Sequence, residues 1–317
     1  MRALDYFVKE PVKYRRPGLA WYRLWQLVHD RTNGALAEPY LRLSRLWRPP
    51  VGLPPAATLA GKERDGVTAL LKRDGFALLP DGLSSADIAA LKQFAFSTPA
   101  YGIDPAKPVH IRETDVPHAE GRYTWRTQDV IGHPVVRRLV TEGPYCAIAQ
   151  DYLGCRPTLV AVTLWVNPPF KGYGANEYHY DNDGPAFLKY FILLTDMDIG
   201  TGAHYFIKGS HTRRKPAQIA RSRLYEADEL FRHYDRIQEH VAGGCAGTIF
   251  AEDTLGFHRG SDITSDYRLL LQLEFAVIDT PQVEELKNPI VPEEVPGLDP
   301  GIASMTRKFY VPGPALS

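Results

Sequence analysis

The stretch Glu177–His211 constrains this chain most, because it combines two potential metal ligands with apolar strand patterns. It starts with Glu-Tyr-His-Tyr-Asp-Asn-Asp, continues through the apolar run Phe187–Thr195, and ends in Gly-Ala-His-Tyr-Phe-Ile-Lys-Gly-Ser-His. His179 and Asp181 are two residues apart, so on an extended strand both side chains point to the same face. Such a pair can hold a metal ion if a second histidine joins it, and two histidines with one carboxylate suit non-haem Fe(II).

A second segment about eighty residues later supplies that histidine and a cation. His258 ends an apolar strand, and Arg268 begins another. In this second strand one face carries Arg268, Leu270, Gln272 and Glu274, and the other face is wholly apolar. A guanidinium beside an iron site is suited to a bidentate pair with a dicarboxylic acid. The alternative is a surface arginine on an edge strand.

These segments resemble the phytanoyl-CoA dioxygenase-like branch of the Fe(II)/2-oxoglutarate-dependent oxygenases. The resemblance covers roughly residues 70–276, and its specificity comes from the order and spacing of its motifs: Gly75-Phe76-Ala-Leu-Leu-Pro, Asp151-Tyr-Leu-Gly154, His179-x-Asp181, Gly209-Ser-His211, His258 and Arg268. It implies that His179, Asp181 and His258 bind Fe(II). It also implies that Arg268 binds the distal carboxylate of 2-oxoglutarate, although relatives can have one more residue between the second histidine and the arginine.

Two further residues are candidates for the 2-oxoglutarate site. The resemblance places Thr163 near the co-substrate. Lys189 lies in the strand after the first two ligands, and an inward lysine there anchors 2-oxoglutarate in other branches of the superfamily. The alternative for Lys189 is an edge residue that extends its ammonium to water. We expect Arg268 rather than Lys189 to be the anchor, and the unused cation to lie near a carboxylate such as Glu274 or near solvent.

The implied activity consumes 2-oxoglutarate and O2, releases succinate and CO2, and hydroxylates an unactivated C–H bond of a small-molecule or lipid/glycoconjugate substrate. Halogenating relatives have a small residue in place of the carboxylate ligand, so Asp181 predicts an oxygenase outcome. Two other classes remain open: a metal-binding jelly roll with lyase or isomerase chemistry, and a sugar-binding jelly roll that uses residues 99–130. Arg268 argues against a purely structural metal site, because such a site does not need a cation to bind an anionic co-substrate.

The pattern of elements predicts an α+β fold, a double-stranded β-helix (a cupin-like jelly roll) flanked by helices from the first half of the chain. Predicted strands include 76–79, 158–166, 187–195 and 267–275, and predicted helices cover 57–73, 84–96, 135–153 and 213–240. In residues 99–130, a cluster of Arg122, Tyr123, Trp125 and Arg126 either lies over the mouth of the site or packs as an ordinary loop. The proline-rich chain after Phe275 is expected to wrap the surface or form a flap.

The first 55 residues form a separate basic, aromatic-rich extension that precedes the catalytic domain of residues 56–317. Ten Lys/Arg and four Asp/Glu lie in the first fifty residues of a chain with zero net charge. Apolar residues at helical spacing predict two helices separated by Asn33-Gly34: Trp21, Leu24, Trp25 and Val28, then Leu36, Tyr40, Leu43 and Trp47. We expect these faces to pack on the domain. The alternatives are a membrane surface or a partner, and the charge pattern disfavours nucleic acid.

The remaining composition predicts a cytoplasmic protein that acts on a small molecule. No apolar run approaches the roughly 18 residues that a membrane span needs, and charges interrupt the N-terminus where a signal peptide would be apolar. The three cysteines, Cys146, Cys155 and Cys245, form no metal or disulfide pattern and are expected to be reduced core thiols. Four further histidines compete as ligands, His204, His211, His233 and His240; His211, after Gly-Ser, is expected to be structural.

Overall fold

The computed structural model describes residues 17–55, 59, 61–169, 177–212, 214–219, 224–279 and 289–314, and of residues 17–21 only the backbone. The expected loop 170–176, which leads to the first metal ligands, therefore lies outside the described residues. The side chain of Trp21, which belongs to the first predicted helix face, also lies outside the described part of the structure.

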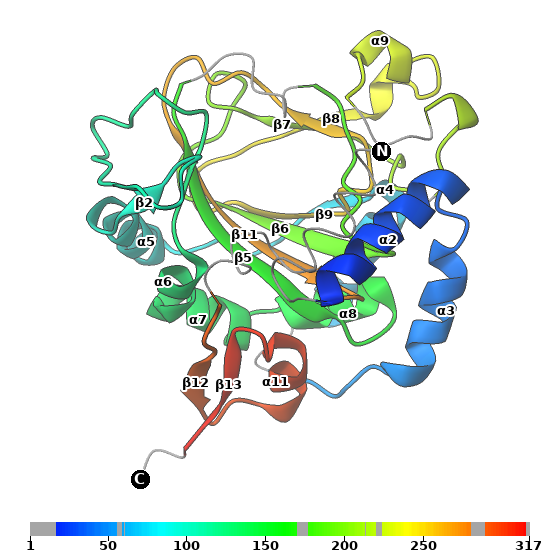
Figure 1. The fold of residues 1–317 in the computed structure, drawn as a ribbon, viewed down its shortest axis with the longest axis horizontal. Helices are drawn as coiled ribbons and strands as arrows, with labels where there is room; N and C mark the ends of the chain where they lie inside the picture. The colour runs from blue at the N-terminus through cyan, green and yellow to red at the C-terminus, as the bar shows by residue number, and fades with distance from the viewer. Residues whose placement is uncertain are drawn as a thin grey trace.

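A large antiparallel sheet forms the centre of the molecule (Figure 1). Within the described residues it has eight strands in the order β1 (Phe76–Leu78), β9 (Ile249–Glu252), β6 (Phe187–Leu193), β11 (Arg268–Ala276), β5 (Thr158–Asn167), β4 (Tyr123–Thr124), β2 (Ala100–Tyr101) and β3 (Pro108–Val109). β11 pairs with β5 on one side and β6 on the other. These three strands are almost wholly buried; β5 is rich in β-branched residues, β6 in aromatic residues and β11 in leucine.

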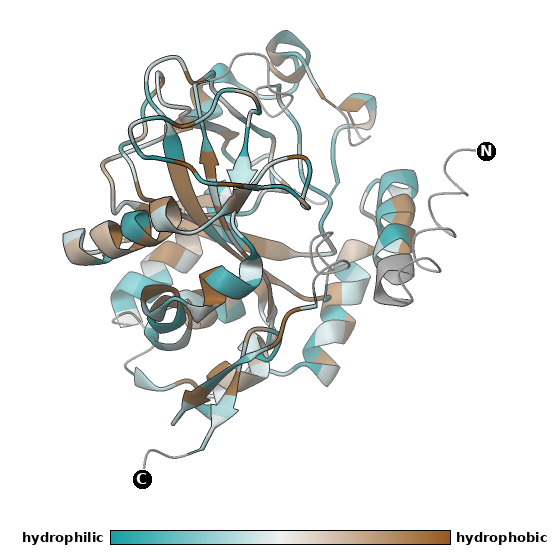
Figure 2. Ribbon diagram, turned by 60° about the vertical axis from the view of Figure 1, so that its left-hand side comes forward, coloured by the Kyte–Doolittle hydropathy of each residue, from teal (hydrophilic) through white to brown (hydrophobic). Residues whose placement is uncertain are grey.

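Helices cover one face of this sheet. They are α4 (Gly61–Asp74), α5 (Ser85–Ser97), α6 (Thr127–Gly132), α7 (Pro134–Glu142), α8 (Tyr145–Leu153) and α11 (Pro300–Thr306). The apolar residues of β11 that share this face, Leu269, Leu271, Leu273 and Phe275, are fully buried in one cluster with residues of these helices. Figure 2 shows the brown strands between more mixed helices. The predicted alternation along β11 is therefore confirmed.

A three-stranded sheet packs on the opposite face. It consists of β10 (His258–Gly260), β7 (His204–Ile207) and β8 (Glu239–Ala242). Phe206 and Ala242 of this small sheet belong to one buried cluster with Trp165, Phe191 and other residues of the large sheet. The described part of the chain is thus a mixed helix and sheet fold in which two antiparallel sheets enclose an apolar layer.

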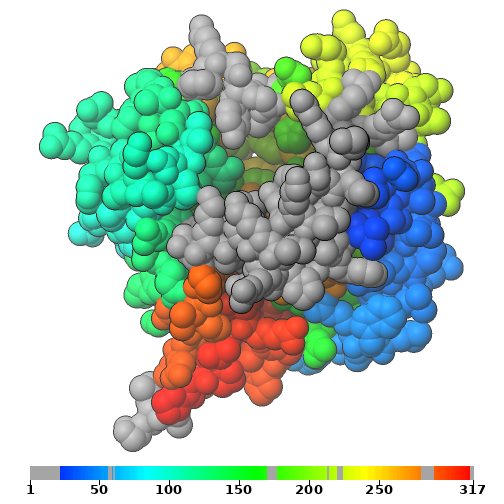
Figure 3. Space-filling model, viewed as in Figure 1, coloured from blue at the N-terminus to red at the C-terminus, as the bar shows by residue number. Residues whose placement is uncertain are grey.

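The two N-terminal helices pack on the rest of the chain. α2 (Pro17–Thr32) and α3 (Ala37–Trp47) are joined through Asn33 and Gly34, which both have positive φ, 48° and 68°. Leu41 is buried against Leu153 and Val277 among others. In Figure 3 these helices form the right-hand edge of the molecule, in blue. The helices therefore pack as expected, but not through the whole predicted faces. In α3 the buried residues are Ala37, Leu41 and Ser44, whereas Leu36, Leu43 and Trp47 are about half exposed, and so is Leu24 of α2.

Two helix predictions are wrong in their extent. The run 135–153 is two helices, since α7 ends at Glu142 and α8 starts after Gly143 and Pro144; a proline lacks the amide that a continuous helix needs. Within 213–240 the described residues contain only short pieces: η3 (Ala217–Ile219), α9 (Ala227–Leu230), η4 (Arg236–Gln238) and the start of β8. Pairing of β8 with β7 outweighs the local helix preference there.

The chain after Phe275 is expected to wrap the surface or form a flap, and most side chains of residues 289–314 are indeed exposed or half-buried, but α11 and the start of the strand after it enter the core. β12 (Glu293–Pro296) pairs in parallel with β13 (Tyr310–Gly313), and α11 lies between them in the sequence. Asp299 caps α11 by accepting from the amide of Ile302, and Pro300 occupies its first turn. The helix then buries Ile302 and Met305 in the main cluster, with Phe309 and Tyr310 after it.

Two smaller findings concern the cysteines and the membrane. Cys146 and Cys155 are buried as expected, but Cys245 is exposed, so its assignment as a core thiol is wrong. None of the helices in the described residues has the length and apolar character that crossing a bilayer requires.

Candidate metal centre

Three side chains from distant parts of the sequence converge on one point. The backbones of His179 and His258 form an antiparallel bridge, each amide donating to the other's carbonyl at 2.9 Å. Asp181 follows in the same segment, with its amide bonded to the carbonyl of Thr254 at 2.8 Å. One potential ligand atom from each of His179, Asp181 and His258 lies within 4.8 Å of the other two. The structure therefore brings together the three residues that the sequence singled out.

Both histidines are oriented by backbone carbonyls. The Nδ1 atom of His179 lies 2.9 Å from the carbonyl oxygen of Glu177, and that of His258 lies 2.9 Å from the carbonyl oxygen of Gly256. A protonated Nδ1 that donates to a carbonyl leaves Nε2 with its lone pair, the tautomer that a metal ligand needs. Burial lowers the pKa of His258 to about 3, so its imidazole is neutral at physiological pH.

Lys189 forms ion pairs with the carboxyl groups around it. Its Nζ lies 2.7 Å from Asp181 Oδ2, 2.7 Å from Asp183 Oδ2 and 3.9 Å from Glu274 Oε2. Burial works against the charged forms of Lys189 and Asp181, but their mutual attraction outweighs it: the pKa of Lys189 is raised and that of Asp181 lowered. The ammonium thus holds Asp181 as an ionised carboxylate. A carboxylate has two oxygens, so it can accept this bond and still offer an oxygen to a metal.

Arg268 is the first residue of β11, whereas Lys189 lies opposite Glu274 near the end of that strand. The Nη1 atom of Arg268 donates to the carbonyl of Gly202, and its Nη2 donates to Asn167 Oδ1 at 3.0 Å. Glu274, opposite Lys189, is six residues further along the strand, which separates the two backbone positions by roughly 20 Å. Thr163 lies between these ends, half-buried on β5 and opposite Gln272 on the polar face of β11.

His204 and Glu252 belong to the site, although His204 was expected only as a competing ligand and Glu252 was missed from the sequence. The His204 ring stacks on that of His258 with 5.2 Å between centroids and 18° between planes. Its Nε2 lies 2.9 Å from Glu252 Oε1. Burial lowers the pKa of His204 to about 3 and raises that of Glu252 to about 8. His204 and Glu252 therefore form an uncharged pair that packs against the ligand His258. The sequence does not show this contact, because it depends on the pairing of β7 with β10.

The arginine and aromatic cluster of residues 122–126 does not cover the site as a unit. Tyr123 and Trp125 are buried in the helix-side cluster, and Trp125 Nε1 donates to the carbonyl of Thr98 at 3.0 Å, so the mouth interpretation is wrong for both. Arg122 does lie on the metal side of the sheet, with its guanidinium 4.3 Å from the centroid of the Trp165 ring. Trp165 Nε1 donates to Asn167 Oδ1, the same oxygen that accepts a hydrogen bond from Arg268 Nη2.

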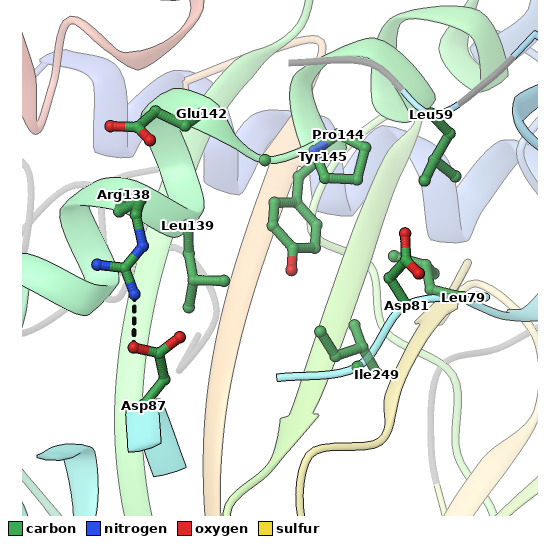
Figure 4. A pocket seen from close by; sticks show the side chains of 12 residues that line it. Leu59, Leu79, Asp81, Asp87, Arg138, Leu139, Glu142, Pro144, Tyr145 and Ile249 are labelled. Atoms are coloured by element: carbon green, nitrogen blue, oxygen red, sulfur yellow. Dashed lines mark hydrogen bonds and ion pairs between the residues drawn. The ribbon is translucent and has the colours of Figure 1, made fainter. Parts of the chain in front are cut away.

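A separate cavity of about 360 Å³ lies on the helix-covered face (Figure 4). Arg138 and Asp87 form an ion pair of 2.5 Å at one side of it, and Tyr145 points into its middle. Its lining includes Leu139 and Ile249, which belong to the helix-side layer. Because that layer and the metal centre are on opposite faces of the large sheet, this cavity is distinct from the metal centre.

Comparisons with known proteins add a fold relationship. No protein-family model matches the chain, and no curated protein matches its sequence. Solved structures do match. The carbocyclase SnoK from nogalamycin biosynthesis, a non-haem α-ketoglutarate-dependent enzyme, is 18% identical, with 74% of this chain and 92% of that chain covered and a TM-score of 0.50. EctD from S. alaskensis, solved with bound Fe, is 20% identical over 74% and 83%, also with a TM-score of 0.50. At these identities the likeness shows a shared fold.

Proposed function

We propose that this chain is an Fe(II)- and 2-oxoglutarate-dependent oxygenase of the phytanoyl-CoA dioxygenase-like type, with a double-stranded β-helix core. The observation that carries the proposal is the convergence of His179, Asp181 and His258 within 4.8 Å. The fold similarity to SnoK and EctD supports it, because SnoK is a non-haem α-ketoglutarate-dependent enzyme and EctD was solved with bound Fe.

The donor set fits Fe(II). Two imidazoles and one ionised carboxylate match the ligands of non-haem Fe(II) oxygenases and leave coordination positions for other molecules. Iron bound with 2-oxoglutarate and O2 would supply an oxidation that is coupled to decarboxylation of the co-substrate. The protein's own part is to keep Nε2 of both histidines unprotonated, to hold Asp181 ionised through Lys189, and to bind the co-substrate.

Arg268 is the proposed anchor for the distal carboxylate of 2-oxoglutarate. Lys189 already has three carboxyl groups within 4 Å, and Asp181 and Asp183 form ion pairs with it, so an added anion would meet negative charge around that lysine. Arg268 donates to two uncharged oxygens, those of Gly202 and Asn167, which orient its planar fork. The role of Lys189 is then to fix the ligand Asp181, and Thr163 is proposed to lie beside the co-substrate between the two ends of β11.

The proposed reaction is hydroxylation, or another oxygenase outcome, on a small molecule or a lipid or glycoconjugate. Asp181 occupies the position at which a halogenating enzyme would leave room for chloride. SnoK, which has a similar fold, is a carbocyclase, so the fold alone does not determine which reaction follows.

The direct test is anaerobic reconstitution with Fe(II), followed by titration with 2-oxoglutarate and detection of the visible charge-transfer absorption of the complex. Succinate release is then measured in air over pools of candidate substrates, with His258→Ala as the inactive control. Iron binding without any 2-oxoglutarate complex would favour the second candidate, a metal-dependent lyase or isomerase. Binding of neither would leave only the non-metal classes.

A further inference from the structure

The N-terminal helix α2 contacts the two residues that follow the ligand Asp181. Tyr22 donates its hydroxyl to Asp183 Oδ1 at 2.9 Å, across 161 residues of sequence. Gln26, one turn later on the same helix face, donates to the Tyr22 hydroxyl oxygen at 2.9 Å and to the carbonyl of Asn182 at 3.0 Å. Both partners, Asn182 and Asp183, immediately follow the ligand Asp181.

Asp183 transmits this contact to the ligand. One of its oxygens accepts from Tyr22, and the other accepts from Lys189 at 2.7 Å. Lys189 in turn donates to Asp181 at 2.7 Å. A continuous chain of hydrogen bonds and ion pairs therefore runs from α2 to the metal ligand. Burial, and then the charge of Asp183, raises the pKa of Tyr22 far above its usual value, so the phenol remains a donor.

Asn182 forms a second attachment. Its side-chain amide donates to Asp30 Oδ1 at 3.1 Å and to the carbonyl of Gln26 at 3.4 Å, and the residue is buried. The ligand segment is thus held from two sides: the Asp181 amide is fixed by Thr254, and the two residues after it are fixed by α2. Trp25 packs beside these contacts on Ile278, which keeps α2 in place through apolar burial.

We propose that α2 is a structural part of the metal centre, and that Tyr22 is a positioning residue that fixes the Asp181 carboxylate through Asp183 and Lys189. The inference rests on the proposed metal-binding function. It assigns α2 to the catalytic unit rather than to a separable extension. Groups that orient metal ligands contribute about 10–100-fold to metal affinity, because without them the ligand samples unproductive rotamers.

The test compares metal binding in the full chain and two matched tyrosine variants. Co(II), an air-stable substitute for Fe(II), is titrated by calorimetry and by its visible absorption, which reports ligand geometry. Tyr22→Phe removes only the hydroxyl in the chain of contacts. Tyr40→Phe is the control: the ring of Tyr40, on α3, packs on Trp25, but its hydroxyl takes no part in the contacts that link Tyr22 to Asp181. Thermal unfolding of the metal-free proteins is measured in parallel.

We expect Tyr22→Phe to weaken Co(II) binding about 10–100-fold and to change its visible spectrum, while Tyr40→Phe keeps the wild-type affinity and spectrum. Asp183→Asn should weaken binding as well, and the double variant should lose less than the sum of the two. Wild-type affinity and spectrum in Tyr22→Phe would overturn the inference and leave the proposed function intact. Failure of the wild-type protein to bind Co(II) or Fe(II) would overturn both.

Discussion

The ammonium of Lys189 lies 2.7 Å from an oxygen of Asp181, so one of the two candidate anchors for 2-oxoglutarate is already paired with a proposed iron ligand. This is the carboxylate environment that we expected for whichever cation does not bind 2-oxoglutarate. Lys189 and Arg268 consequently have different proposed tasks, and single substitutions should separate them.

Arg268→Ala should raise the KM for 2-oxoglutarate by roughly one to three orders of magnitude, the effect of losing a charge-assisted bidentate pair. Lys189→Ala should raise it less and should instead lower metal affinity and stability, because it leaves Asp181 and Asp183 as unpaired, partly buried carboxylates. Arg236→Ala, at an exposed ion pair with Asp228, serves as the control. Steady-state kinetics of succinate formation give the ranking. A larger KM effect from Lys189→Ala would reverse the assignment.

Removal of a ligand should abolish metal binding. We expect wild-type protein to take up one Fe(II) per chain under anaerobic conditions, and His179→Ala, Asp181→Ala and His258→Ala to retain little after desalting, since two ligands hold a metal far less tightly than three. Metal content is measured by mass spectrometry. His233→Ala, an exposed histidine, should bind like wild type. Full occupancy in His258→Ala would remove that residue from the ligand set.

The stability of the metal-free protein should fall as the pH rises from 6.5 to 8. Burial raises the pKa of both Glu252 and Glu274 to about 8, above the value near 4.5 of an unfolded glutamate. In this window the folded state therefore holds protons that the unfolded state has lost, and each group costs up to about 1.4 kcal/mol per pH unit. His204 and His258, with pKa values lowered to about 3, destabilise the fold only below about pH 6.5.

Glu252→Gln should make this decline shallower, because an amide does not titrate. Urea unfolding at pH 6.5, 7.2 and 8.0 measures the free energy of unfolding for wild type, Glu252→Gln and the exposed control Glu226→Gln. The control should keep the wild-type slope. An unchanged slope in Glu252→Gln would show that this carboxyl is ionised throughout the window.

The N-terminal helices should contribute to the stability of the whole chain. Leu41, only 2% exposed, packs against Leu153 and Val277, so Leu41→Ala should lower the free energy of unfolding by about 2–5 kcal/mol. Leu46 on the same helix is 77% exposed, and Leu46→Ala should change stability by less than about 0.5 kcal/mol. Equal effects of the two variants in urea unfolding would mean that α3 does not dock in solution.

Deletion of residues 1–50 should lower the melting temperature more than it changes binding to anionic vesicles, because it exposes the apolar surface under Trp25 and Leu41. Thermal unfolding and vesicle sedimentation are measured on the intact and shortened chains. If the shortened chain kept its melting temperature while the intact chain sedimented with vesicles, a membrane-surface role would replace packing.

The sequence by itself determined the local features of this protein. The pattern along 268–275 specified which face of β11 is wholly apolar, and the two-residue spacing put His179 and Asp181 on one face. The helix predicted over 84–96 starts at such a feature, since Ser84 accepts from the amide of Asp87 and caps α5. These features follow from backbone geometry and hydrogen bonds within a few residues, which a single sequence contains.

Only the tertiary structure decided which distant segments meet. The bridge that sets His258 beside His179, the stacking of His204 on His258 and the contact of Tyr22 with Asp183 all join residues far apart in the chain. The same holds for β8 within a charged, helix-like stretch and for the C-terminal unit of residues 289–314, whose helix α11 enters the core. Strand pairing and apolar burial depend on the surface that a partner segment offers, and local propensity carries no information about that partner.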